Sequence, residues 1–125
     1  MTGITFDAGG LIALDRDDRR VIALLARAAE TGAVVTVPAT ALAQAMRQPS
    51  RQTRLSRLIR QPTTRVAPLD GLDATRVGLL LASSRTADIT DAHVIVCAKR
   101  SGDPVVTSDP RDLRRLDPAV RLVVV

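Results

Sequence analysis

The stretch Ile4-Thr5-Phe6-Asp7-Ala8-Gly9-Gly10-Leu11-Ile12-Ala13-Leu14 contains the pattern that decides the fold. A short apolar strand is predicted from Thr2 to Phe6, and Asp7 follows it directly before an apolar helical segment. The same order, a strand followed by an acid, recurs at Val105-Val106-Thr107-Ser108-Asp109. Because the carboxyl ends of parallel strands meet at one edge of a sheet, we expect Asp7 and Asp109 to emerge at the same edge.

The rest of the chain continues this alternation of strands and helices. Further helices are predicted at 19–31, 39–48, 50–61, from Asp70 or Asp73 to Ser84, 92–100 and 110–116, and further strands at 33–37, 64–69, 105–108 and 122–125. The alternation implies right-handed crossovers between parallel strands. We therefore predict an α/β fold, with one three-layer α/β/α domain over residues 1–125 and a central parallel sheet of four to five strands.

Capping residues predict where several helices begin and end. The charged run from Asp15 to Arg20 is predicted to be a solvated loop, in which Asp17 or Asp18 caps the following helix. Gly32 ends that helix. Pro38 is predicted at a first helical position, where its missing N–H costs nothing.

The composition narrows the class of partner. The 125 residues include 18 Lys and Arg against 13 Asp and Glu, which gives a formal net charge of +5, and Lys99 is the only lysine. An arginine-rich surface favours a polyanionic partner, since guanidinium groups suit phosphates. The coding bias of a GC-rich genome explains the same composition equally well. Phe6 is the only aromatic residue, which argues against a sheet that stacks bases.

Cysteine content and hydropathy indicate the cellular compartment in which the protein works. Cys97 is the only cysteine, which excludes an internal disulfide and a multi-cysteine zinc site and fits a reducing compartment. The N-terminal residues enter a strand pattern at once, without a basic region and a long apolar segment. The apolar runs are far shorter than the roughly 20 residues that span a bilayer. We therefore expect a cytoplasmic protein without membrane contact.

Aspartates are the main candidates for chemistry. Asp7, Asp88, Asp91 and Asp109 each follow or flank a predicted strand or helix start, and Asp112 lies close behind. Each of them alone could be a helix cap, and Asp91 is predicted to open the helix at 92–100. As a set they would repel one another, because neighbouring carboxylates raise one another's pKa. A divalent cation among them is the simplest remedy.

Four phrases along the chain resemble the successive motifs of a known family. They are Phe6-Asp7-Ala8-Gly9-Gly10-Leu11-Ile12-Ala13-Leu14, Val37-Pro38-Ala39, Asp91-Ala92-His93-Val94-Ile95-Val96-Cys97-Ala98 and Val105-Val106-Thr107-Ser108-Asp109. In this order and spacing they resemble a PIN domain, and more narrowly the VapC-type toxins of bacterial toxin–antitoxin operons. The resemblance covers essentially the whole chain.

The resemblance implies an activity and a set of site residues. A PIN domain of this type is a magnesium- or manganese-dependent endoribonuclease, inhibited by a cognate antitoxin protein and often dimeric. Asp7, Asp91 and Asp109 would hold the metal, since hard cations prefer oxygen ligands. Thr107 would support Asp109, and Asp88 and Asp112 are secondary candidates.

One position departs from the family pattern. The family places a glutamate in the helix after the second strand, and Gln44 stands at the matching position. The only glutamate of the chain is Glu30, on the preceding helix. We keep Gln44 in the catalytic set, although a glutamine supplies no negative charge. The alternative function is therefore a degenerate PIN-like module that binds RNA or protein without cutting.

An arginine-rich segment is the remaining candidate. Arg51, Arg54 and Arg57 recur every three residues in the helix predicted at 50–61 and are candidates for RNA binding. A solvated helix face explains them at least as well, because three-residue steps spiral around a helix. A third class, the phosphoacceptor receiver domain, needs paired acids after the first strand and a lysine after a late strand. The sequence has neither in the expected place.

Overall fold

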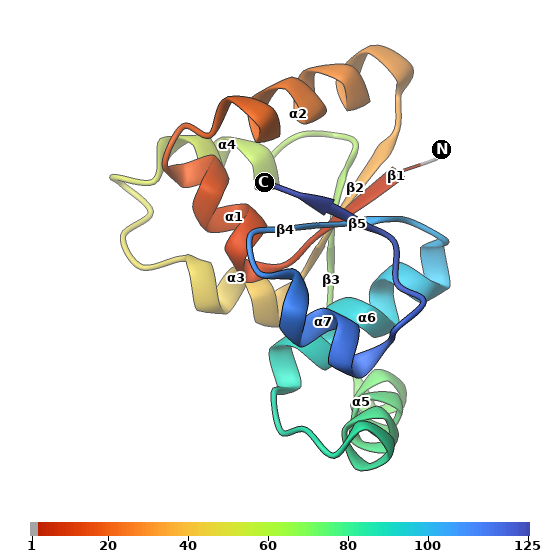
Figure 1. Cartoon of the computed structure of the whole chain (residues 1–125). Coiled ribbons are helices and arrows are strands. Elements are labelled where there is room, and N and C mark those ends of the chain that lie inside the picture. Colours follow the sequence, from red (N-terminus) through yellow and green to blue (C-terminus); the bar gives the residue numbers. More distant parts are fainter. Residues whose placement is uncertain (1–2) are drawn as a thin grey trace.

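The computed structural model describes residues 3–125, in which twelve elements alternate along the chain (Figure 1). The strands are β1 (Gly3–Phe6), β2 (Val34–Pro38), β3 (Thr64–Ala67), β4 (Val105–Thr107) and β5 (Leu122–Val124). The helices are α1 (Ala8–Asp15), α2 (Arg19–Thr31), α3 (Ala39–Ala45), α4 (Thr53–Ile59), α5 (Gly71–Ser84), α6 (Ile89–Ser101) and α7 (Pro110–Leu116). The predicted order of elements is confirmed, and Thr2 lies outside the described residues.

The strands form one parallel sheet in the order β3-β2-β1-β4-β5. The first strand of the chain is therefore the central one. β1 pairs with β2 on one side, with Ile4 opposite Val35, and with β4 on the other, with Phe6 opposite Val106. The predicted α/β class and the parallel sheet are confirmed, with five strands in the described residues.

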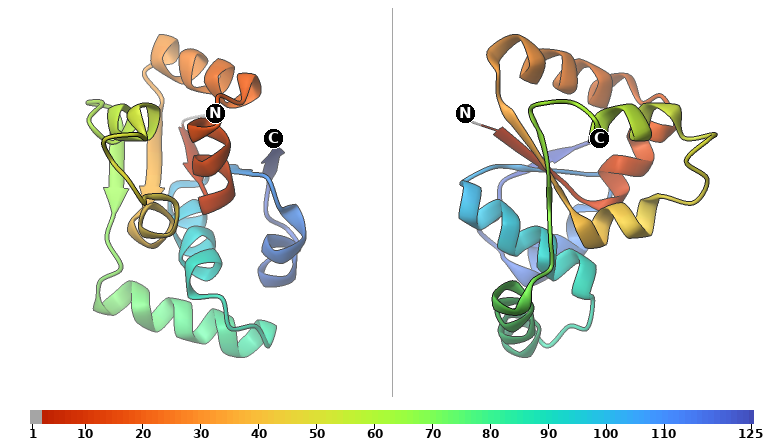
Figure 2. Two further views of the ribbon diagram at one scale, coloured as in Figure 1. Left: turned by 90° about the vertical axis from the view of Figure 1, so that its left-hand side faces the viewer. Right: turned by 180° about the vertical axis from the view of Figure 1, so that it is seen from behind.

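Helices cover the central strands on both faces. α1 contacts β1 and β4, and α6 contacts β1, β2 and β4. Figures 1 and 2 show α1 and α4 on the side of the sheet opposite α6. All four residues of β1 and all three of β4 are buried, as expected of strands covered on both faces. No helix within residues 3–125 is long and apolar enough to cross a membrane.

The approach of α1 to the sheet depends on a glycine. A Cβ atom added to Gly10 would lie 2.4 Å from the carbonyl oxygen of Val106 on β4. No side chain fits there, so the glycine allows the first turn of α1 to pack directly on the neighbouring strand. Asp7, which caps this turn, is thereby held at the carboxyl edge of the sheet.

Several predicted boundaries differ from the structure. Pro38 is not at a first helical position, because it has extended φ and ψ of −59° and 134° and pairs with Ala67 as the last residue of β2. Sheet pairing outweighs the preference of proline for a helix start. Asp88, and not Asp91, caps α6, and Asp18 caps α2. The predicted loop from Asp15 to Arg20 shortens to three residues, 16–18.

The segment between α3 and α4 is organised by one buried amide. The Gln52 side chain accepts hydrogen bonds from the N–H groups of Arg47 and Gln48 at 2.7 and 2.8 Å, and it donates to the carbonyl oxygen of Ala45 at 2.9 Å. These contacts end α3 at Ala45, where the sequence pattern predicted a helix to Gln48. A side-chain contact of this kind leaves no periodic signal in the sequence.

Candidate active site

Five aspartates meet at the carboxyl edge of the sheet. Asp7 follows β1, Asp109 follows the adjacent strand β4, Asp88 and Asp91 lie at the start of α6, and Asp112 lies in the first turn of α7. Burial, together with the charges of the other four carboxylates, raises the pKa of Asp91 to about 7. The carboxylates thus act on one another through their charges at this edge, although within residues 3–125 no three of them bring oxygen atoms within 4.8 Å of one another.

Asp7 is both a helix cap and a member of this cluster. Its side chain is buried, with 4% of its surface exposed, and its Oδ1 accepts a 2.7 Å hydrogen bond from the N–H of Gly10. Burial raises the pKa of Asp7, against the opposing effect of hydrogen bonds from the Thr107 hydroxyl and Gly10, and the charge of Asp109 adds to the increase. A carboxylate held this deep gains from a cation beside it.

Asp109 occupies the N-cap position of α7 without making the capping hydrogen bond. Instead its N–H donates to Oγ1 of Thr107 at 3.0 Å, and Thr107 is fully buried. The Thr107 hydroxyl therefore joins the end of β4 to both Asp7 and Asp109. The Asp109 carboxylate is left for another partner, whereas the local sequence Asp109-Pro110 favours a cap.

Two arginines share a cavity with the aspartates. This cavity of about 300 Å³ is lined by Asp88, Asp91 and Asp112 and also by Arg85 and Arg115. Within residues 3–125, neither arginine forms an ion pair with any carboxylate. The cavity thus offers negative groups for a cation and free positive groups for an anion. The sequence pattern did not predict that Arg85 and Arg115 lie near the aspartates, because the two residues follow no regular spacing.

The backbone at Arg85 is unusual. This residue ends α5 in the left-handed conformation, with φ of 56°, a position that glycine usually occupies. A non-glycine residue there costs free energy, of the order of 1 kcal/mol. The left-handed turn redirects the chain from α5 to the start of α6 and carries the Arg85 side chain to the cavity.

Gln44 lies near the end of α3 with an exposed side chain. The charges of Asp7 and Asp109 act on the pKa of Asp91, and Gln44 makes no ion pair or charge contribution there because its side chain is neutral. Its predicted place in the catalytic set therefore stays a prediction.

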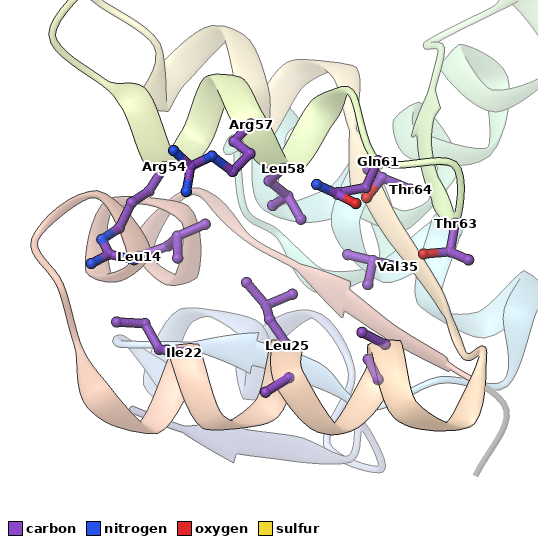
Figure 3. Close-up of a pocket in the computed structure, with 13 residues that line it drawn as sticks. Leu14, Ile22, Leu25, Val35, Arg54, Arg57, Leu58, Gln61, Thr63 and Thr64 are labelled. Carbon is purple, nitrogen blue, oxygen red and sulfur yellow. The ribbon is translucent and has the colours of Figure 1, made fainter.

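The three arginines predicted to bind RNA lie elsewhere. Arg54 and Arg57 line a second cavity of about 440 Å³ between α2, α4 and β2, whose other walls are mostly apolar (Figure 3). Arg54 also forms an ion pair with Asp17. Arg51 lies in the exposed turn before α4. The structure does not bring these side chains to the aspartates, and their role in RNA binding stays a prediction.

A tighter group of possible metal ligands lies apart from the aspartates. Ligand atoms of Asp73, His93 and Cys97 lie within 4.8 Å of one another, and all three side chains are buried. The sequence pattern alone assigned no joint role to these residues. The four-residue spacing of His93 and Cys97 on a helix was the available signal, since it places both on one face.

Comparisons with known proteins agree with this fold. The family model described as PIN domain matches residues 4–118. Among solved structures, the chain is similar to FitAcB from Neisseria gonorrhoeae, with 19% identity, a TM-score of 0.59 and 95% of each chain covered. It is also similar to VapBC2 from Rickettsia felis bound to a DNA fragment from its promoter, with 11% identity, a TM-score of 0.66 and 98% of each chain covered. No curated protein sequence matches significantly.

Proposed function

The chain belongs to the PIN domain family, whose members are generally nucleases, and we propose that it is the toxin of a toxin–antitoxin pair that hydrolyses RNA with a divalent metal ion. The single observation that carries the proposal is the cluster of Asp7, Asp88, Asp91, Asp109 and Asp112 at the carboxyl edge of the sheet. That edge is where parallel α/β sheets build their sites.

The donor set fits Mg²⁺ or Mn²⁺. Asp7, Asp91 and Asp109 would hold the ion, and Asp88 and Asp112 would contact its water shell. All five donors are carboxylates, which hard cations prefer, and the pKa of Asp91 is raised first by burial and then by the other carboxylates, both of which a cation would offset. When bound, such an ion activates water and stabilises the leaving oxygen in phosphodiester hydrolysis.

The chain's own residues position the site and its substrate. Thr107 accepts a hydrogen bond from the backbone N–H of Asp109 and its hydroxyl lowers the pKa of Asp7, so it would support both proposed ligands. Arg85 and Arg115 form no ion pair within residues 3–125. They line the cavity of Asp88, Asp91 and Asp112 and would bind phosphates flanking the cleaved bond. Contacts to phosphates hold RNA without reading its sequence.

The proposed partners follow from two further surfaces. The cavity between α2 and α4 has an apolar floor with Arg54 and Arg57 at its rim, which suits an antitoxin segment that combines apolar and acidic residues. The similar structures from Neisseria and Rickettsia, FitAcB and VapBC2, are toxin–antitoxin complexes, which supports an antitoxin partner for this chain. Leu72 and Leu79 are exposed on α5, at 61% and 68%, and would lie in a homodimer interface. The proposed place of action is the cytoplasm.

The second candidate function is a binding module without nuclease activity. Gln44 favours it, because an exposed neutral amide stands where the family pattern has a glutamate. Such a module would bind RNA through the same arginines but would not cut it.

RNA cleavage by the purified chain distinguishes the two functions. We expect cleavage of single-stranded RNA with Mg²⁺ or Mn²⁺, none in chelator, and a loss of at least about 100-fold in Asp109→Asn. This substitution removes one charge and leaves no capping hydrogen bond to break. Binding of RNA without metal-dependent cleavage would establish the binding module. Cleavage that is equally fast in Asp109→Asn would contradict the proposed site.

A further inference from the structure

The group formed by Asp73, His93 and Cys97 joins α5 to α6. His93 and Cys97 are four residues apart on α6 and point to the same side, toward Asp73 in the first turn of α5. The exposed fractions of Asp73, His93 and Cys97 are 3%, 0% and 2%. Their ligand atoms lie within 4.8 Å of one another. The group is thus buried as deeply as Asp7, whereas Asp88, Asp109 and Asp112 of the proposed active site are exposed.

One atom of this group lacks a partner. The Nδ1 atom of His93 lies 2.7 Å from Oγ1 of Thr40, which fixes the orientation of the ring. Its Nε2 atom is buried without a hydrogen bond in the described residues, and the closest carboxylate oxygen, Oδ2 of Asp73, is 3.9 Å away. That distance is too long for a hydrogen bond. Two ligands at about 2.0–2.2 Å from one tetrahedral ion lie about 3.3–3.6 Å apart, so the two atoms would have to approach by a few tenths of an ångström to share an ion.

The carboxylate of Asp73 divides its two oxygens between different neighbours. Oδ1 accepts from Arg76 at 3.2 Å and from Arg100, whereas Oδ2 faces His93. The arginines therefore orient the carboxylate and leave one oxygen free on the side of the histidine. Burial raises the pKa of Cys97 to about 11, while the charge of Arg100 acts in the opposite direction. A metal ion would deprotonate this thiol on binding.

We propose that Asp73, His93 and Cys97 form a binding site for Zn²⁺ or a similar transition-metal ion, separate from the Mg²⁺ or Mn²⁺ site. Nitrogen, sulfur and one carboxylate oxygen form a donor set that suits Zn²⁺ and not the hard cations. The Thr40 hydroxyl accepts the Nδ1 proton of His93 and so leaves the Nε2 lone pair to the ion. The site ties α5 to α6, and Asp91 lies on α6 two residues before His93.

The competing description is a metal-free network. The Pro68 carbonyl group acts on the His93 ring, so an Nε2–H group directed at Pro68 and Asp73 would also fill the space. The two descriptions differ in the tautomer of His93 and in the state of Cys97. An ion would reach the site past Arg76 and Arg100, which line a cavity of about 630 Å³ beside it.

Cobalt titration tests the site directly. Because the chain has one cysteine and one histidine, every thiolate-to-cobalt absorption band must come from Cys97, and every histidine ring signal from His93. We expect the chelator-treated full chain to develop a near-ultraviolet thiolate–Co²⁺ band that saturates at one ion per chain. Zn²⁺ should abolish the band, and it should shift the ring nitrogen resonances of His93. A folded wild-type chain that shows neither response to the metals would overturn the proposal.

Matched variants separate this site from the proposed nuclease site. Cys97→Ser should lose the thiolate–Co²⁺ band, and His93→Gln should weaken Co²⁺ binding at least tenfold. Circular dichroism would confirm that both variants are folded. Asp109→Asn should retain the band with unchanged affinity. A band that disappears in Asp109→Asn or persists at full affinity in His93→Gln would contradict a three-ligand site. No RNA is present and no cleavage is measured, so these outcomes do not depend on the proposed function.

Discussion

Asp91 is the residue whose charge costs the fold most when no cation is bound. Its pKa is raised to about 7, while an unfolded aspartate ionises near 3.9. Between these values the folded chain holds a proton that the unfolded chain has lost, so stability must fall as pH rises from about 4 to about 7. Above about pH 7 Asp91 is ionised in the folded chain as well, and the loss of stability from its charge is complete.

We therefore predict that Asp91→Asn stabilises the protein in chelator at about pH 8 and flattens the fall in melting temperature between about pH 5 and pH 8. Asp103, whose pKa is also raised by burial, is present in both proteins and does not affect the comparison. Asp7 and Asp91 repel each other, so the substitution also removes that repulsion, which acts in the same direction. Added Mn²⁺ should reverse the order at pH 8. Parallel melting profiles for the two proteins in chelator would show that the pKa of Asp91 is not raised in the folded chain.

Gln44 allows a second test of the metal site. If its side chain faces the proposed ion, Gln44→Glu adds a charged oxygen ligand, so it should bind Mg²⁺ or Mn²⁺ more tightly. In chelator the added charge should lower the melting temperature, and in Mn²⁺ it should raise it. Calorimetric titration and melting curves in both conditions measure these signs. Unchanged values would place Gln44 outside the metal site.

The sequence was informative about single residues where their position along the chain decides their place. Asp7 and Asp109 follow strands, and parallel strands bring such residues to one edge, so their meeting could be predicted. Asp73 and Arg115 could not be found in this way. Their neighbours come from other helices, and helix packing leaves no pattern in a single sequence.

At the scale of elements, the packing of α1 on β4 depends on Gly10. Gly10→Ala should reduce the free energy of unfolding by about 1–3 kcal/mol, because the added Cβ would lie 2.4 Å from a backbone oxygen that has little room to move. Gly78 on α5 is the matched control, since a Cβ there has no atom within 4 Å. Gly78→Ala should instead raise the free energy of unfolding by about 0.5–1 kcal/mol.

Urea denaturation of the two variants measures whether each substitution lowers or raises the free energy of unfolding. Equal effects of the two substitutions would mean that α1 tolerates a wider gap from the sheet. The Gly10 variant should also weaken Mn²⁺ binding, because a displaced α1 moves Asp7, whereas the Gly78 variant should leave it unchanged.

The elements themselves were largely predictable, and so were the ends of some of them. Periodicity and stop signals predicted α2 and α7 with the observed limits, because local forces decide them. The end of α3 at Ala45 depends on the Gln52 amide, and the place of Pro38 in β2, directly before the start of α3 at Ala39, depends on its pairing with Ala67. Both are tertiary effects.

At the scale of the whole molecule, two separate groups of arginines supply positive charge. We predict that replacing Arg85 and Arg115 with alanine reduces the salt dependence of RNA binding. The slope of the logarithm of the binding constant against the logarithm of the salt concentration should become shallower by about 0.7–1 unit for each phosphate that is no longer neutralised. Binding should be measured in Ca²⁺ across a range of salt concentrations, to avoid cleavage. Replacing Arg51, Arg54 and Arg57 with alanine is the comparison.

The double and triple variants show which of the two arginine groups contacts the RNA. A lower slope only in the Arg85 and Arg115 variant would place RNA in the cavity of the aspartates. A lower slope only in the Arg51, Arg54 and Arg57 variant would support the stripe predicted from the sequence and would contradict the proposed roles of Arg85 and Arg115.

The strand order also determines when during synthesis the protein acquires its site. β1 is made first but needs β4 as its neighbour, and the proposed ligands Asp7 and Asp109 are separated by most of the chain. A nascent chain that has emerged from the ribosome only as far as α5 still lacks Asp91, Asp109 and both strands on one side of β1. The proposed ribonuclease is therefore inert while most of it is being translated, so it does not cut the messenger that encodes it before its own synthesis is nearly complete.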